Sequence, residues 1–263
     1  MILVDGEPSD HVPVTDSVVQ RGDGVFEALR TADGRPFALE EHLDRLERSA
    51  AAMDLEVVDR ELLRSWVDLA AEPVGHALVR ILLTRGDNGT GGRTVVLSEP
   101  LPVVPEPFSV LPHRAPWHPA GRPWELAGVK TLSYAPNLAA SRIARRAGYS
   151  DALLVSDDDT ILEGPTFCIG WLVDGHFETP SLDLGILASI TRAQAIELAG
   201  SIGVGVLEGR FHLDRLEKAT DVIAMSTVKQ VTPVARCGDL EPPATDFTDR
   251  LRRAFASFAA GAG

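Results

Sequence analysis

A proline-rich stretch between Pro100 and Pro123 restricts the fold of this chain more than any other feature. Proline fixes φ and has no backbone N–H, so such a stretch neither continues a helix nor makes a good central strand. We expect one strand near Phe108 to Leu111 and then a crossing between two lobes, since 263 residues suffice for two modest domains. The predicted division is a small N-terminal domain at 1–112, a linker at 113–122 and a larger C-terminal domain at 123–263.

The first lobe changes from strand-like to helix-like periodicity. Residues 25–30 predict a strand, and Asp33-Gly34 predicts the turn that follows it. From Leu39 to Met53 the apolar residues recur every three or four positions, which indicates one face of a helix. The remaining predicted elements of this lobe are a hairpin at its start, a helix at 61–70, a strand at 77–84, a Gly-rich loop at 85–92 and a strand at 95–97.

The second lobe is predicted to begin at Lys130 and to continue as a mixture of strands and helices. Asp174-Gly175 indicates a tight hairpin, and Gly148 is placed to end a helix. The sum favours an α+β chain over a parallel βαβ series. The predicted helices are 137–147, 191–199 and 247–258, and the predicted strands are 152–155, 160–162, 167–173, 176–178, 222–225 and 231–234.

Charge and composition exclude several classes of partner. A net charge of −13 argues against binding to nucleic acid or to an anionic membrane, because both need basic patches. No run of about eighteen apolar residues predicts a membrane span, and the amino terminus lacks the pattern of a signal peptide. Cys168 and Cys237 are too few for a disulfide framework, so we expect a cytoplasmic protein.

Several familiar motifs are incomplete here. The glycine-rich segment 86–94 lacks the Gly-Lys-Ser/Thr that opens a helix in a Walker loop, so we interpret it as a surface loop or a lid over the substrate. Neither a Gly-x-Ser-x-Gly elbow nor a His-Glu-x-x-His helix occurs. His113 and His118 have no acidic or thiol neighbours along the chain, so we expect no metal site.

Four features of the second lobe suit one cofactor. Lys130 follows a short strand-like segment, Glu163 precedes Gly164-Pro165, and Thr191 opens a helix. Ser226-Thr227 closes another strand. A lysine for an imine, a carboxylate for a ring nitrogen and a helix start for a phosphate are what pyridoxal phosphate requires. Each feature also has an ordinary interpretation, as a surface lysine, a turn residue or a helix cap.

Taken in order, longer motifs of the chain resemble the class IV aminotransferases, the fold-type IV pyridoxal-phosphate family. That family includes D-amino acid and branched-chain aminotransferases, (R)-selective amine transaminases and aminodeoxychorismate lyase. The resemblance implies a two-domain α+β fold, with a small N-terminal α/β lobe and a larger, β-barrel-like C-terminal lobe with helices. It also implies a homodimer. The motifs that carry it are residues 21–30, 41–46, 130–137, 162–164, 179–180, 185–192 and 226–234.

By this resemblance Lys130 forms the imine with the cofactor and then carries the proton between substrate and cofactor. Glu163 would face the pyridine nitrogen and keep the ring protonated. Arg45 would reach the phosphate. In many relatives a serine-rich run follows the glutamate, but residues 165–168 differ here. We interpret Cys168 as a packed strand residue, and the difference bears on how the carboxylate is held. The other expected cofactor ligands are Tyr134, Ser189, Ile190, Thr191, Ser226 and Thr227.

The sequence says less about the substrate. A substrate carboxylate needs cationic donors. The small, glycine-rich loop expected at the rim of the substrate pocket suggests that the pocket accepts substrates of different kinds. We expect a transaminase that moves an amino group between D-amino acids, or (R)-primary amines, and a 2-oxo acid. An L-branched-chain aminotransferase, an aminodeoxychorismate lyase and a non-catalytic relative remain alternatives. Against the last stands the joint retention of Lys130, Glu163, Arg45 and Thr191. The candidate substrate-binding residues are Phe26, Arg30, Arg80, Arg85 and Arg93.

Overall fold

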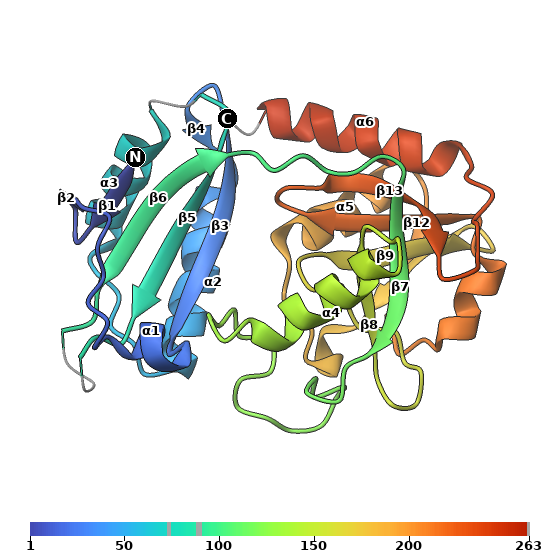
Figure 1. Ribbon diagram of the computed structural model, residues 1–263. Coiled ribbons are helices and arrows are strands. Elements are labelled where there is room, and N and C mark those ends of the chain that lie inside the picture. Colours follow the sequence, from blue (N-terminus) through green and yellow to red (C-terminus); the bar gives the residue numbers. More distant parts are fainter. Residues whose placement is uncertain (73–74, 88–90, 262–263) are drawn as a thin grey trace. The chain divides into compact units, whose positions relative to one another are not determined.

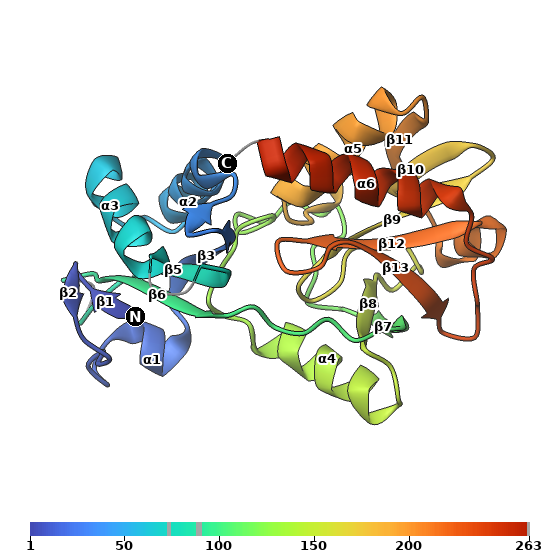
Figure 2. The same ribbon diagram turned by 90° about the horizontal axis from the view of Figure 1, so that it is seen from above.

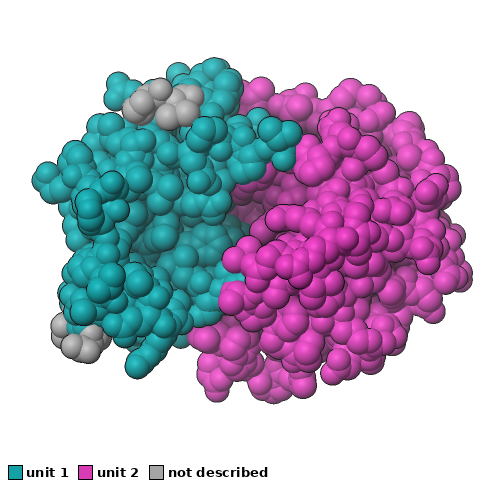
Figure 3. All heavy atoms as spheres, in the orientation of Figure 1, with its two compact units in different colours: residues 1–103, 129–134, 261–263 teal, residues 104–128, 135–260 magenta. Residues whose placement is uncertain are grey.

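The computed structural model describes residues 1–72, 75–87 and 91–261. Its contacts divide the chain into two compact units, which Figure 3 colours separately. Unit 1 consists mainly of residues 1–103 and 129–134, and unit 2 of residues 104–128 and 135–260. These boundaries differ from the linker predicted at 113–122. The reason is that residues 108–114 form a strand paired inside unit 2, so the proline-rich stretch is partly regular structure.

Unit 1 is a six-stranded antiparallel sheet with helices (Figure 1). The strand order is β2-β1-β6-β5-β3-β4, and the hairpin expected at the start of the chain is present as the pair β1–β2. The strands are β1 (Ile2–Val4), β2 (Glu7–Pro8), β3 (Gly24–Ala32), β4 (Arg35–Pro36), β5 (Ala77–Thr84) and β6 (Thr94–Pro100), and the helices are α1 (Ser17–Arg21), α2 (Leu39–Ala52) and α3 (Arg60–Ala71).

Helices α2 and α3 both lie on one face of this sheet (Figure 2). The apolar positions that predicted α2 are its buried ones, among them Leu43 and Leu46, and they pack against Leu29 of β3. Helix α3 begins where the Asp59 carboxylate accepts the N–H groups of Glu61 and the following residue, as expected for an N-cap. The helices therefore cover one face of the sheet.

Strand β3 has buried side chains on one face of the sheet and partly exposed side chains on the other. Val25, Glu27 and Leu29 are fully buried, and they alternate with the partly exposed Phe26 and Arg30. Because successive residues of a strand point to opposite faces, Phe26 and Arg30 share the face away from the core helices.

Unit 2 is built on a seven-stranded mixed sheet of order β11-β10-β9-β12-β13-β7-β8. The pairs β7–β8, β7–β13 and β10–β11 are parallel, and the remaining pairs are antiparallel. The strands are β7 (Phe108–Arg114), β8 (Asp151–Val155), β9 (Cys168–Val173), β10 (His176–Pro180), β11 (Gly205–Gly209), β12 (Asp221–Ser226) and β13 (Gln230–Cys237). The helices are α4 (Ala135–Arg146), α5 (Ile190–Ser201) and α6 (Asp246–Gly261), with short 3₁₀ turns at Leu182–Leu184 and Leu213–Lys218.

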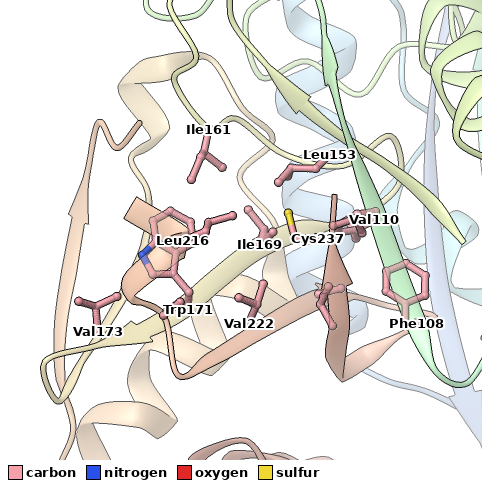
Figure 4. Close-up of a cluster of buried hydrophobic side chains, with 14 residues drawn as sticks. Phe108, Val110, Leu153, Ile161, Ile169, Trp171, Val173, Leu216, Val222 and Cys237 are labelled. Atoms are coloured by element: carbon pink, nitrogen blue, oxygen red, sulfur yellow. The ribbon is translucent and has the colours of Figure 1, made fainter. Parts of the chain in front are cut away.

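The core of unit 2 surrounds Trp171 (Figure 4). Its ring is fully buried, and its Nε1–H donates to Glu178 at 2.8 Å, so the one polar atom of the indole is satisfied. Cys168 and Cys237 are both buried and not disulfide-bonded, and burial raises the pKa of the Cys237 thiol to about 12. Cys168 is thus the packed strand residue that the sequence predicted.

The α+β fold and most predicted elements are confirmed. The hairpin predicted at Asp174-Gly175 joins β9 and β10, and both residues have the positive φ that a two-residue turn of this kind requires. In the part of the chain that the structure describes, no helix is long and apolar enough to cross a membrane. The Gly-rich loop at 85–92 is described only in part, because residues 88–90 lie outside the described ranges.

Candidate active site

Lys130 lies at the edge of β3 and belongs to unit 1, so the prediction that it opens the second lobe is wrong. Its carbonyl accepts the N–H of Phe26 at 3.0 Å, and Leu132 N–H donates to the carbonyl of Gly24 at 2.8 Å. Lys130 N–H in turn reaches the Ser49 hydroxyl on α2 at 3.3 Å. Through these backbone hydrogen bonds to β3, the short segment 129–134 belongs to unit 1.

The side chain of Lys130 lies beside two aromatic rings. Its Nζ is 4.4 Å from the centre of the Phe26 ring. Tyr134 meets the same ring edge-on, with centroids 5.6 Å apart and planes at 85°. Lys130, Phe26 and Tyr134, each predicted from the sequence to serve the site, are therefore brought together.

Two of the four candidate arginines share a face of the unit 1 sheet with Phe26. Arg80 on β5 is paired with Ala28, so it projects to the same side as Phe26 and Arg30. Arg80 is already engaged, because its Nε donates to Glu99 at 2.7 Å. Arg30 has no hydrogen bond or ion pair from its side chain to any residue that the structure describes. Arg30 is therefore the better placed of the two to bind a substrate carboxylate.

The other two arginines are held by carboxylates near the end of β5. Arg85 Nε donates to Asp23 at 2.7 Å, and other nitrogens of its guanidinium bond backbone carbonyls. Arg93 bonds Asp16 at 3.0 Å and Asp87 at 3.2 Å. Both side chains have structural partners, so they fit a substrate-binding role less well than Arg30.

Arg45, the predicted phosphate ligand, belongs to a buried cluster of charges. Its Nε and Nη2 bond the two oxygens of Glu27 at 2.6 and 2.7 Å, and His42 Nδ1 lies 2.8 Å from the same carboxylate. Burial acts to raise the pKa of Glu27, but Arg45 and His42 outweigh it and hold that pKa well below the usual range. Because Ser49, one turn after Arg45, bonds Lys130, this cluster adjoins the lysine segment.

The buried His42 makes stability depend on pH. Burial lowers the pKa of His42 from its ordinary value of about 6.5 despite its bond to Glu27, so the folded state binds a proton here less readily than the unfolded chain does. The unfolded chain protonates it below about pH 6.5, and stability should decline as the pH falls through that value. Urea unfolding at pH 7.5 and 5.5 measures this. His42→Gln should lose less stability between the two pH values than the wild type, and an equal loss would contradict the assignment.

Glu163 in unit 2 is held from three sides. Leu187 N–H donates to both carboxylate oxygens, at 3.3 and 3.2 Å, and Cys168 Sγ lies 3.9 Å from Oε2. His118 Nε2 lies 3.7 Å from Oε1. These contacts hold the carboxylate in a fixed position. Sequence reasoning predicted Glu163 but set His118 aside, since its neighbours are distant along the chain.

Helix α5 offers an anion-binding start three residues after Leu187. Its N-cap is Ser189, whose hydroxyl accepts the N–H of Arg192 at 3.3 Å. The N–H groups of Ile190 and Thr191 have no hydrogen-bond acceptor within the described residues. Free N–H groups at a helix start attract phosphate. The predicted phosphate-binding residues at this helix therefore present the expected donors.

Ser226 and Thr227 lie where β12 ends and turns toward β13. The Ser226 hydroxyl accepts the N–H of Lys229 at 3.1 Å, which fixes this turn, and its own proton has no acceptor among the residues that the structure describes. Helix α5 packs against β12. The structure thus places both residues at the end of a strand, as predicted.

The chain matches a family model described as "Amino-transferase class IV" over residues 24–237. It is 35% identical over 223 residues to "Bifunctional aminodeoxychorismate lyase / D-amino acid transaminase" of Mycobacterium tuberculosis, covering 77% of this chain and 76% of that protein. It is 30% identical to "Putative branched-chain-amino-acid aminotransferase" of Methanocaldococcus jannaschii, covering 87% and 83%. The chain therefore belongs to the class IV aminotransferase family.

Solved structures agree with this assignment. The fold-IV transaminase CpuTA1 from Curtobacterium pusillum matches with a TM-score of 0.86 and 34% identity, covering 94% of this chain and 91% of that one. The PLP-bound form of a hypothetical aminotransferase from M. tuberculosis matches with a TM-score of 0.89 and 27% identity, covering 98% and 99%. The protein is thus a fold-type IV enzyme of a class that uses pyridoxal phosphate (PLP).

The residues present fit this cofactor. A phosphate needs donors, and the start of α5 supplies two N–H groups without another acceptor in the described chain. A protonated ring nitrogen needs an anion, and Glu163 is a carboxylate fixed by a backbone N–H. The aldehyde needs an amine, and Lys130 has an apolar ring beside its Nζ.

Proposed function

We propose that this protein is a transaminase that moves an amino group between D-amino acids or (R)-primary amines and a 2-oxo acid. The observation that carries this proposal is the placement of Lys130 on the sheet face that also holds Phe26 and Arg30. A nucleophilic amine and a cation for a substrate carboxylate are the two groups that such a reaction needs from the protein. The name of the M. tuberculosis relative supports the D-amino acid class.

When bound, PLP supplies the electron sink that makes the substrate Cα–H bond acidic. Lys130 would hold the cofactor covalently through Nζ, and this nitrogen, once released, would accept the Cα proton. The Phe26 ring restricts the positions open to Nζ and keeps water from one side of it. Tyr134, packed on Phe26, would border the substrate or bond the cofactor hydroxyl.

The other cofactor ligands are proposed from the resemblance to the family. Glu163 would hold the ring nitrogen in its protonated form. For the phosphate we propose Arg45, whose guanidinium is oriented by two bonds to Glu27. The remaining proposed phosphate ligands are Ser189, Ile190, Thr191, Ser226 and Thr227.

Half-reactions with single amino donors test the substrate class. The holoenzyme is mixed in turn with D-alanine, D-glutamate, (R)-1-phenylethylamine and L-leucine, and conversion of the cofactor to its amine form is followed by absorbance. We expect conversion by a D-amino acid or the (R)-amine and none by L-leucine. Conversion by L-leucine alone would contradict the proposal and favour the branched-chain activity named for the M. jannaschii relative.

Arg30 provides a sharper version of this test. If Arg30 binds the substrate carboxylate, Arg30→Ala should lower kcat/KM for D-alanine by about tenfold to a hundredfold. It should change the rate with (R)-1-phenylethylamine little, because that amine has no carboxylate. Arg85→Ala is the control, since Arg85 is paired with Asp23. Equal losses with both substrates would exclude Arg30 as the carboxylate ligand.

Aminodeoxychorismate lyase is a second candidate, because the M. tuberculosis relative carries both names. This activity would release pyruvate from aminodeoxychorismate without any amino acceptor. Pyruvate release in the absence of a 2-oxo acid, with no conversion of the cofactor by D-amino acids, would favour the lyase over the transaminase.

We further propose that the protein works as a homodimer, as the resemblance implies, and that it lies in the cytoplasm, as its low cysteine content suggests. Sedimentation of the purified holoenzyme measures the assembly directly. A mass near twice 28.2 kDa would support the dimer, and a mass near 28.2 kDa would contradict it.

A further inference from the structure

His118 has a buried ring nitrogen that no described residue satisfies. The side chain is only 8% exposed, and its Nε2 has no hydrogen-bond partner in the part of the chain that the structure describes. A buried polar atom without a partner destabilises the fold unless something else compensates. Such an atom therefore points to a function.

The backbone around His118 decides which ring nitrogen carries the proton. Ala120 N–H donates to Nδ1 at 3.1 Å, so Nδ1 is an acceptor and a neutral ring has its hydrogen on Nε2. The loop itself is fixed, because His118 N–H donates to Ala115 at 2.9 Å and Arg122 Nη2 donates to the carbonyl of His118 at 3.1 Å. The imidazole therefore presents an Nε2–H in a set direction.

The acceptor nearest to this donor is the Glu163 carboxylate. Nε2 lies 3.7 Å from Oε1, and a movement of about half an ångström would form a hydrogen bond. Leu187 N–H already bonds both oxygens, and Cys168 lies on the side of Oε2. An ionised carboxylate has about four acceptor positions, so a further one remains for a cofactor nitrogen.

We propose that His118 is a positioning residue for Glu163. Its Nε2–H holds Oε1 and fixes the direction in which Glu163 meets the cofactor ring nitrogen. The inference rests on the proposed role of Glu163 and adds the group that orients it. Of the residues 165–168, Cys168 lies beside Oε2, and His118 lies on the side of the other oxygen, Oε1.

Cofactor affinity of the full-length chain tests this proposal without relying on activity. PLP is titrated into apoenzyme and its Kd is measured by quenching of tryptophan fluorescence. His118→Asn keeps an acceptor near Nδ1 but is too short to reach Glu163, and it should weaken PLP binding about tenfold. His118→Gln places an amide N–H near the position of Nε2 and should stay within about threefold of wild type. His118→Met is of similar length but has no hydrogen-bond donor, so it is the second variant that should weaken PLP binding.

A double-mutant cycle separates positioning from a structural role. If His118 acts through Glu163, His118→Asn should cause no further loss of PLP affinity in a Glu163→Gln background. The visible absorption band of bound cofactor in His118→Asn should also move toward that of Glu163→Gln. Equal losses in both backgrounds, or wild-type affinity in His118→Asn and His118→Met, would overturn the proposal. A wild-type chain that takes up no PLP would instead contradict the proposed function itself.

Discussion

Replacing Lys130 by alanine is expected to lower the transamination rate by more than about 10⁴-fold, because in the proposed function its one nitrogen serves as both attachment point and proton carrier. The backbone of residue 130 makes the bonds to β3, and these do not need the lysine side chain. The variant should therefore fold. Steady-state kinetics with the donor identified by the half-reactions, together with a melting curve, measure both effects.

The matched control for this variant is Lys218→Ala. The chain has three lysines, at 130, 218 and 229, and Lys218 is an exposed residue of a 3₁₀ turn. This substitution removes the same charge and should leave the rate within about twofold of wild type. A Lys130→Ala enzyme that retained a tenth of the wild-type rate would exclude Lys130 as the reacting amine.

Replacing Glu27 by glutamine is expected to destabilise the protein by about 3–5 kcal/mol, because it leaves the buried Arg45 guanidinium without its anion. This loss of stability is expected at neutral pH. The pKa of Glu27 is depressed in the folded state, so its contribution is present above the unfolded value near 4.5 and is lost as the pH falls through the folded pKa. Urea unfolding at pH 7.5 measures the difference.

Glu40→Gln is the matched control, because Glu40 also pairs with an arginine but is half-exposed on α2. Water screens such pairs, so this substitution should change stability little. If Glu27→Gln and Glu40→Gln lower the free energy of unfolding by the same amount, the Glu27–Arg45 pair would not stabilise unit 1 in the way that its buried geometry indicates. A fall in PLP affinity of Glu27→Gln would also support Arg45 as a phosphate ligand.

Local patterns in the sequence predict the helices well. Leu39, Leu43, Leu46 and Ala50 follow the helical period, and α2 covers them all. The pattern works because burial of one face decides where an amphipathic helix lies. Strand β11 was not predicted. Its burial does not alternate, and its pairing with β10 comes from a parallel contact between residues about thirty positions apart.

The position of Lys130 shows what a local pattern cannot supply. The residue was predicted as reactive, but its segment was assigned to the second lobe, whereas hydrogen bonds to Gly24 and Phe26 place it in unit 1. Such pairing joins residues over a hundred positions apart, and no periodicity reports it.

The environment of Glu163 also depends on contacts between residues that are distant along the chain. His118 was set aside because its sequence neighbours are neither acidic nor thiol, yet the fold brings Glu163 near its ring and Cys168 to the same carboxylate. The lysine, the glutamate and the helix start could be predicted because each belongs to a motif that resembles the family. The residue that orients Glu163 has no motif and could be found only from the structure.

Reduction of the PLP-loaded enzyme with borohydride, followed by peptide mapping, tests the central claim most directly. The reagent fixes the cofactor on whichever lysine holds it, and the three lysines of the chain lie in separate parts of the sequence. We predict a single labelled peptide that contains Lys130. Label on Lys218 or Lys229, or no label on a chain that has bound PLP, would contradict the account.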